Sequence, residues 1–320
     1  MDKKNNIFQT IDMRYTYYTE VDIGISASAF LLLFHIFTFF LRRRPKPTDL
    51  PIGLLALIHL MMLSVGIKAR GSFESQGIWN DFICKTTFYS YRTLRGLSLC
   101  TTCLLRVLQA ITLSPRSSWL AKFKQTSTHH NLCSLLILCF FCMSISSHLI
   151  TTIIATPNFT SESLMYVTDH CSIRPMSCLL LRLTVSMLVS MRDVFLLGLM
   201  ALSSAYMVTL LCRHRRQSRH LHGTSPSPRA SPELRATRTI LLLLCFFMVM
   251  SILDCFISSS RVLLNNSQIL YCVHTIVAYS YAAISPSVFI STEKRIITFW
   301  KTNWGGGNQC FIVLTDKFSE

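Results

Sequence analysis

The chain has 320 residues, of which 51% are hydrophobic and 14% are charged, and its formal net charge is +16. The hydrophobic fraction is high for a soluble domain of this length, and glycine and proline are too scarce for a disordered chain. Nucleic-acid binding would require a basic face on a soluble surface, and the sequence shows none. The composition therefore indicates a membrane protein.

Seven apolar segments, each bounded by polar or charged residues, follow one another along the chain. The first is long enough to cross a bilayer, which takes about 20 residues, and it ends at the basic run RRRPKP. The second is at the short limit for a span, and the third carries three cationic residues in its first half. We predict an all-α membrane protein with a seven-transmembrane helix bundle. The expected spans are residues 21–41, 50–67, 82–113, 132–155, 194–212, 239–259 and 269–291, with 1–20 before them and 292–320 after them.

The positions of Lys and Arg predict the orientation of this bundle. With the N-terminus outside, the cytoplasmic segments hold about twice as many of these residues as the outer segments, as the positive-inside rule requires. The basic loops then face anionic lipid of the inner leaflet. Residues 1–20 are polar and the first apolar stretch is too long for a signal peptide, so we expect an uncleaved signal-anchor. The predicted location is the plasma membrane, with a cytoplasmic C-terminus.

Two other signals agree with this orientation. The Asn-X-Ser/Thr tripeptides at Asn158 and Asn265 are separated by two expected spans, so both lie on one side of the membrane, and the predicted orientation places that side outside, where glycosylation occurs. Cys84 opens the third span and Cys171 lies in the loop before the fifth, so both face the oxidising side. We expect a disulfide between them, with free thiols as the alternative.

Catalytic chemistry has little support in the sequence. The pair Cys100 and Cys103 has the spacing of a metal or redox motif, but it falls inside a span with no second pair, so helix packing is the better interpretation. No nucleophile elbow, phosphate loop or zinc-protease motif is present. We therefore expect neither an enzyme nor a metal or cofactor site.

Four longer motifs occur in order along the chain. They are RGLSLCTTCLLRVLQAITLSPRSSWLAKFK from Arg95, TPNFTSE from Thr156, the segment from Arg192 to Leu243 that begins RDVFLLGLMALSSAYMVTLLCRHRR, and AISPSVFISTEK from Ala283. Together they closely resemble vomeronasal type-1 receptors, and the resemblance covers residues 21–300. It implies a G-protein-coupled receptor fold, a small pheromone ligand, and a heterotrimeric G protein of the Gi/Go type. A bitter-taste-type chemoreceptor is the nearer alternative. A transporter is the more distant one, and the lack of an internal repeat counts modestly against it.

Charged residues within the spans are the leading candidates for ligand binding, because burying such a group costs several kcal/mol unless it is paired or hydrated. Arg92 and Arg95 lie roughly 12 to 17 Å below Cys84 along the helix, which is the depth of the ligand cavity in receptors of this architecture. Tyr91 shares a face with Arg95 four positions later, which places an aromatic ring beside a cation. Snorkelling, or pairing with Asp193 or Asp254, is the competing interpretation for both arginines.

Four further residues complete the candidate ligand site. Asp254 is the only acid of the sixth span and would hold either a basic ligand group or a structural arginine. Arg192 and Asp193 mark the outer end of the fifth span, and because they are adjacent on one helix we expect their side chains to diverge toward different partners. Tyr279 offers aromatic surface near the cavity, although core packing is the better prediction for it.

The cytoplasmic end lacks the Asp-Arg-Tyr triplet that closes the third span in the larger receptor class. That place holds Leu108-Gln109-Ala110, and Arg106 lies nearly on the face of Gln109. Arg106, where the family usually has a small polar residue, would either reach the G-protein end or point into the bundle. The residues expected to contribute to G-protein coupling are Arg106, Gln109, Arg116, Arg213 and Arg216.

Overall fold

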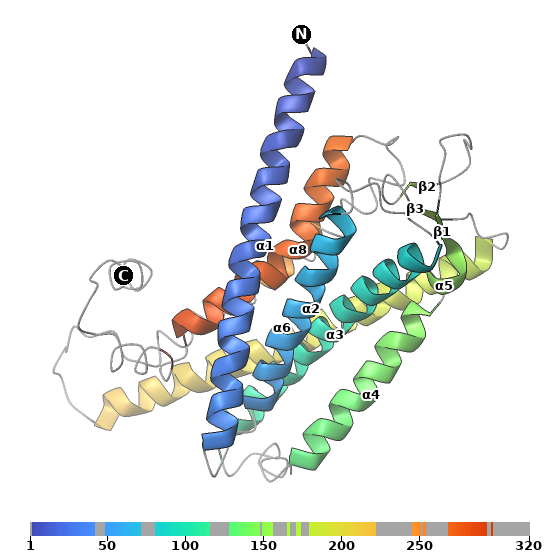
Figure 1. Ribbon diagram of the computed structural model, residues 1–320. Coiled ribbons are helices and arrows are strands. Elements are labelled where there is room, and N and C mark those ends of the chain that lie inside the picture. The colour runs from blue at the N-terminus through green and yellow to red at the C-terminus, as the bar shows by residue number, and fades with distance from the viewer. Residues whose placement is uncertain are drawn as a thin grey trace.

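The computed structural model is a bundle of long helices with one small sheet at one end (Figure 1). The helices are α1 (Asp2–Leu41), α2 (Asp49–Gly71), α3 (Asp81–Leu113), α4 (Thr128–Ser146), α5 (Leu149–Thr152), α6 (Leu179–Leu221) and α8 (Gln268–Thr292). The strands are β1 (Ile153–Ala155), β2 (Met165–Tyr166) and β3 (Cys171–Ile173). The structure describes residues 2–41, 49–71, 81–115, 128–147, 149–155, 165–166, 171–173, 179–221, 245–250, 252–253, 268–292 and 296.

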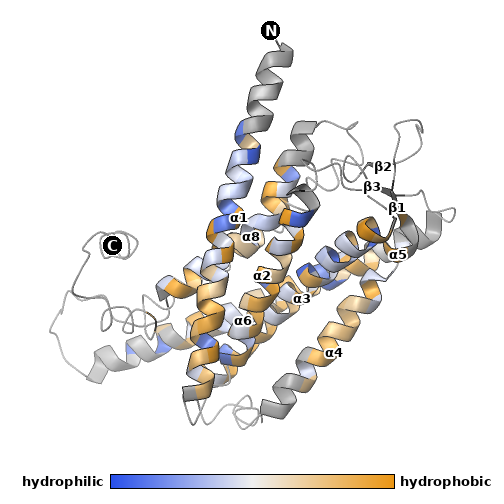
Figure 2. Cartoon of the chain, in the orientation of Figure 1, coloured by the Kyte–Doolittle hydropathy of each residue, from blue (hydrophilic) through white to orange (hydrophobic). Residues whose placement is uncertain are grey.

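Five helices in the described part of the chain are long and apolar enough to cross a membrane. Their apolar portions are Asp12–Phe40, Asp49–Lys68, Phe82–Leu113, Met187–Leu210 and Val273–Ser291. They coincide with five of the seven predicted spans, and α4 adds the shorter apolar stretch Leu136–Ser146. Apolar residues run along these helices in Figure 2. The protein is therefore a multi-pass helical membrane protein, and the count of seven stays a prediction because residues 239–244 and 254–259 lie outside the described residues.

One predicted boundary is wrong, and one helix is longer than its expected span. The fourth span was expected to run to residue 155, but α4 ends at Ser146, where the backbone N–H of Ser147 and its hydroxyl both bond to the Ser144 carbonyl. Residues 153–155 form a strand, because the β-branched side chains of Ile153 and Ile154 suit extended chain that pairs with β3. α6 begins at Leu179, before the expected span 194–212, because a helix can continue beyond its membrane-crossing part, and its apolar portion Met187–Leu210 overlaps that span.

The sheet was not predicted. Its strand order is β1-β3-β2 with both pairs antiparallel, and Ala155 lies opposite Cys171 while Met165 lies opposite Ile173. β1 directly follows α5, and it contacts the end of α3 at which that helix begins. The sheet therefore covers one end of the bundle.

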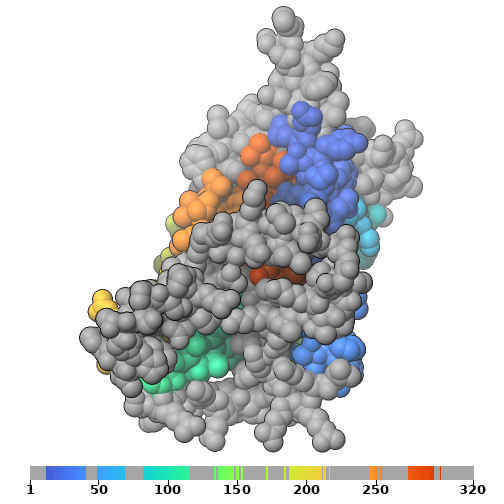
Figure 3. Space-filling view, turned by 90° about the vertical axis from the view of Figure 1, so that its left-hand side faces the viewer, coloured from blue at the N-terminus to red at the C-terminus, as the bar shows by residue number. Residues whose placement is uncertain are grey.

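The bundle is closed by contact between its first helix and its last described helix. α1 packs mainly on α8 and α2, while α3 packs on α2, α6 and α4. Figure 3 shows α1 beside α8 on one face of the molecule. The approach is close at Gly24, where a Cβ would lie 2.6 Å from the Cα of Ala283. Glycine is needed here because any side chain would meet the backbone of α8.

Candidate functional site

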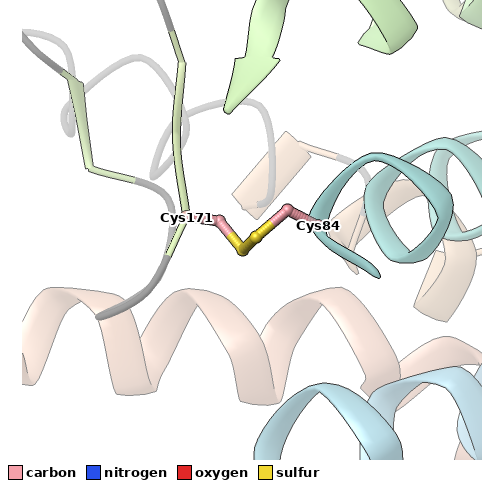
Figure 4. Close-up of a disulfide and its surroundings, with 2 residues drawn as sticks. All are labelled: Cys84 and Cys171. Atoms are coloured by element: carbon pink, nitrogen blue, oxygen red, sulfur yellow. A yellow bond between two sulfur atoms is a disulfide. The ribbon is translucent and has the colours of Figure 1, made fainter. Parts of the chain in front are cut away.

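The N-terminal end of α3 is fixed by a disulfide. Cys84 and Cys171 are bonded, with their Cα atoms 5.9 Å apart, and both are fully buried (Figure 4). Ile153 completes this small apolar cluster, and Phe88 and Leu149 pack against it. The predicted disulfide is confirmed, and it ties β3 to the first turn of α3.

Further along α3, three predicted ligand residues come together between α3 and α8. Arg95 donates a hydrogen bond from Nη1 to the Tyr91 hydroxyl at 3.3 Å, which confirms that the two share a face of α3. The Tyr91 hydroxyl donates to the Ala278 carbonyl at 3.5 Å, and its ring lies 5.0 Å from the ring of Tyr279. Tyr279 is buried, in agreement with the packing role that was preferred for it. The Arg95 guanidinium thus lies beside a pair of aromatic rings, Tyr91 of α3 and Tyr279 of α8.

Tyr17 completes this aromatic group, and Gly66 leaves space for it. The sequence singled out neither residue. Tyr17 of α1 is fully buried, and its ring meets the ring of Tyr279 edge-on at 5.8 Å. A Cβ at Gly66 of α2 would lie 2.6 Å from the Tyr17 hydroxyl and 2.8 Å from the Tyr279 ring. The missing side chain at Gly66 therefore makes room for both rings. No local sequence pattern identifies such a contact, because it depends on which helix faces meet.

A small cavity lies beside Arg95. Its free volume is about 30 Å³, enough for one or two water molecules. The lining is mainly apolar, with polar groups from α3 and α8. The described residues that line it are Met62, Arg95, Ser98, Leu99, Phe247, Met250, Val277, Ala278 and Tyr281.

The expectation for Arg192 and Asp193 is wrong. Their side chains do not diverge: Arg192 Nη2 lies 2.7 Å from Asp193 Oδ1, and Nε donates to the same oxygen at 2.8 Å. Arg192 is buried over Gly96 of α3, where a Cβ would lie 2.9 Å from its Nη1. The reason is that a long guanidinium arm can fold back on its own helix, and pairing within the bundle avoids the cost of a bare charge.

Arg92 belongs to the same charged region. Its electrostatic neighbours include Arg95 on its own helix and both Arg192 and Asp193 on α6. The structure thus places Arg92 near three other predicted ligand residues, one on its own helix and two on α6. Asp254, the remaining acid of the set, lies outside the described residues, as do Asn158, Asn265 and Arg116.

In the C-terminal half of α3, Arg106 points into the bundle. Its side chain is 3% exposed, and Nη1 donates a hydrogen bond to Gln109 Oε1 at 3.1 Å. The pairing agrees with the prediction that the two residues share a face. Arg213 and Arg216, near the end of α6, are exposed.

We call the part of the cavity wall formed by Ser98 and Tyr281 the cavity floor. A buried polar network borders the cavity there. His59 of α2 makes hydrogen bonds at both ring nitrogens, from Nε2 with Ser98 Oγ of α3 at 2.8 Å and from Nδ1 with Ser285 Oγ of α8 at 3.1 Å. The ring of Tyr281 stands edge-on to His59 at 5.4 Å, and its hydroxyl lies 3.0 Å from Thr102 Oγ1. Sequence reasoning missed this network, and the only hint of it was one histidine in an apolar span.

Together, the membrane-crossing helices, the disulfide-tied end and the interior polar groups define a multi-pass helical membrane protein with a small internal cavity. The chain matches the vomeronasal organ pheromone receptor family over residues 11–302, and it belongs to that family. Members of this family are G-protein-coupled receptors, so the chain is a receptor and not an enzyme.

Curated relatives agree along nearly the whole chain. Vomeronasal type-1 receptor 94 of Rattus norvegicus is 52% identical over 94% of this chain and 93% of its own length. Vomeronasal type-1 receptor 90 of Rattus norvegicus is 54% identical, covering 95% of this chain and 98% of the relative. Vomeronasal type-1 receptor 47 of Mus musculus is 50% identical over 94% and 97%. The family resemblance predicted from the four motifs is confirmed.

Proposed function

We propose that the receptor binds a small pheromone from the external side, in the cavity between α3, α8 and the helical residues 245–250. The observation that carries this proposal is the cavity lining, in which Arg95, Ser98 and Tyr281 face mainly apolar side chains. Apolar walls with a few placed polar groups are typical of small-molecule sites. Arg95 is the proposed recognition residue, and Tyr91 and Tyr279 hold it in place.

The size of the cavity constrains how the ligand enters. Ligand sites commonly have volumes of about 300 to 1,000 Å³, whereas this cavity has about 30 Å³. In this proposal the described packing is the closed state, and a pheromone would stabilise a second packing in which the lining side chains have moved. Phe247 and Tyr281 line the cavity with rings that meet edge-on at 4.3 Å, and a pheromone-sized ligand would have to displace them.

The proposed orientation places the N-terminus outside and the C-terminus in the cytoplasm, at the plasma membrane. Disulfides persist on the oxidising side of a membrane, and the bond between Cys84 and Cys171 lies where α3 begins. That location supports an external start for α3 and agrees with the distribution of Lys and Arg. The same orientation places Asn158 and Asn265 on the external side, where we propose that they are glycosylated.

The proposed signalling partner is a heterotrimeric G protein of the Gi/Go type, as the family resemblance implies. Its docking surface would form at the cytoplasmic ends of α3 and α6, from Arg116, Arg213 and Arg216. Arg106 would contribute from within the bundle, where Gln109 now accepts one of its hydrogen bonds. Its remaining N–H groups would become available to the partner when the helices separate.

A ligand screen tests the function. Cells that express the chain with Gαi, Gαo, Gαs or Gαq sensors are exposed to pools of small organic molecules from conspecific secretions. The proposal expects at least one pool to activate the Gαi or Gαo sensor, with no response in cells that lack the receptor. Activation seen only through Gαs or Gαq would contradict the proposed partner, while leaving the receptor assignment intact.

A further inference from the structure

The buried network around His59 joins three helices, and the proposed function assigns it no role. His59 is 1% exposed, Ser98 is 3% exposed and Ser285 is fully buried. A polar group in a membrane interior is costly unless it is hydrogen-bonded, and three such groups at one level add to that cost. A neutral imidazole has one donor and one acceptor, and hydroxyl groups can serve either, so the histidine is satisfied in both tautomers.

The network touches the cavity floor through two residues. Ser98 and Tyr281 both line the cavity, and both contact His59, one through a hydrogen bond and the other through its ring. Thr102 fixes the Tyr281 hydroxyl from α3. A molecule that displaces either lining residue must therefore disturb a group that is held by His59.

The network also reaches the proline-containing part of α8. Ser285, which bonds to His59, directly precedes Pro286, the proline inside this helix. A proline removes one backbone hydrogen bond and permits a kink, so the helix can bend there at low cost. His59 holds the residue next to that point against α2 and α3.

We propose that His59 is a positioning residue for signalling: its two hydrogen bonds hold α2, α3 and α8 in the closed packing, and its ring packs against Tyr281 at the cavity floor. A ligand that moves Tyr281 or Ser98 breaks this bridge and lets α8 bend at Pro286. The bridge is therefore the element through which cavity occupancy reaches the cytoplasmic ends of the helices. The link between this bridge and ligand binding rests on the proposed function, because it needs the ligand to occupy the cavity. The restraint that His59 places on the three helices does not depend on the cavity.

The test uses ligand-independent signalling, so that an error in the cavity position does not affect it. His59→Phe keeps an aromatic ring against Tyr281 and removes both hydrogen bonds. The matched control is His35→Phe, because His35 is also buried but its ring bonds to the Leu31 carbonyl of its own helix, at 2.9 Å. The measurement is G-protein dissociation in cells without added ligand, divided by the amount of receptor at the surface.

The expected result is a rise in basal signalling per surface receptor for His59→Phe, roughly two- to tenfold for each of the two hydrogen bonds lost, as bonds of ordinary strength predict. His35→Phe should match the parent. An unchanged or lower basal signal for His59→Phe would overturn the proposal. A rise of the same size in both variants would also overturn it, because the effect would then belong to any buried histidine.

Smaller changes cover the case in which His59→Phe fails to reach the surface. Ser98→Ala and Ser285→Ala each remove one of the two bonds and leave the histidine in place. Each should raise basal signalling, and the double variant should show less than the product of the two effects, because both act through one side chain. His59→Gln, which retains one polar contact, should fall between the parent and the double variant. If both serine variants show the same basal signalling as the parent receptor, the proposal is wrong.

Discussion

Replacing Gly24 by alanine should destabilise the bundle by forcing α1 away from α8. The new methyl carbon would lie 2.6 Å from Ala283 Cα, 2.9 Å from Ala283 Cβ and 2.9 Å from Leu63 Cδ1. Carbon atoms in contact are normally about 3.5 to 4.0 Å apart, so the helices must separate by about 1 Å. Because two of the atoms belong to Ala283, with its backbone Cα nearest, no flexible side chain can absorb the change. Overpacking of this kind costs about 1 to 3 kcal/mol.

Gly198→Ala is the matched control, because a Cβ at Gly198 of α6 would meet nothing within 4 Å. Both substitutions replace a helical glycine, so the gain in helix propensity of about 1 kcal/mol is common to them and cancels in their difference. Thermal unfolding of the purified receptor in detergent should give a clearly lower midpoint for Gly24→Ala than for Gly198→Ala. Equal midpoints would refute the close contact between α1 and α8.

Three further predictions concern the site and its setting. Arg95→Gln should preserve surface expression and lower the potency of an activating ligand by about ten- to a hundredfold; failure to reach the surface would make Arg95 structural, and parental potency would exclude it from the ligand site. Cys84→Ser opens a loop of 87 residues and should cost about 4 to 5 kcal/mol, measured as a loss of folded receptor at the surface; normal expression and stability would argue against a structural role for the bond. An epitope tag beside Asn265 should bind antibody on intact cells, whereas a tag beside Ser225 should do so only after permeabilisation, and the reverse pattern would invert the topology.

The positions of the helices were predictable because hydropathy reports the environment of each residue directly. Five of the expected spans coincide with apolar helices of the described chain. The disulfide was predictable for a similar reason, since counting spans placed Cys84 and Cys171 on the same side of the membrane. The shared face of Tyr91 and Arg95 followed from the period of the helix. Each of these features depends on local periodicity or on the number of spans.

Features that depend on how helices pack were not predictable. The His59 bridge joins residues far apart in the sequence, and each of its serines is an ordinary residue of an apolar helix. The ion pair of Arg192 and Asp193 was missed because the rule for adjacent helical residues considers side-chain directions and ignores the length of an arginine. The sheet was missed because the hydropathy of residues 153–155 suits a helix end as well as a strand.

The close contact between Gly24 and Ala283 has a consequence for how cells make this protein. Translation delivers α1 to the membrane long before α8, so the Gly24 face of α1 must remain uncovered by its main partner until the end of synthesis. A chain truncated before Gln268 never covers that face. Such products would be retained and degraded as unfinished proteins, so that a late nonsense mutation removes the receptor from the cell surface as completely as an early one.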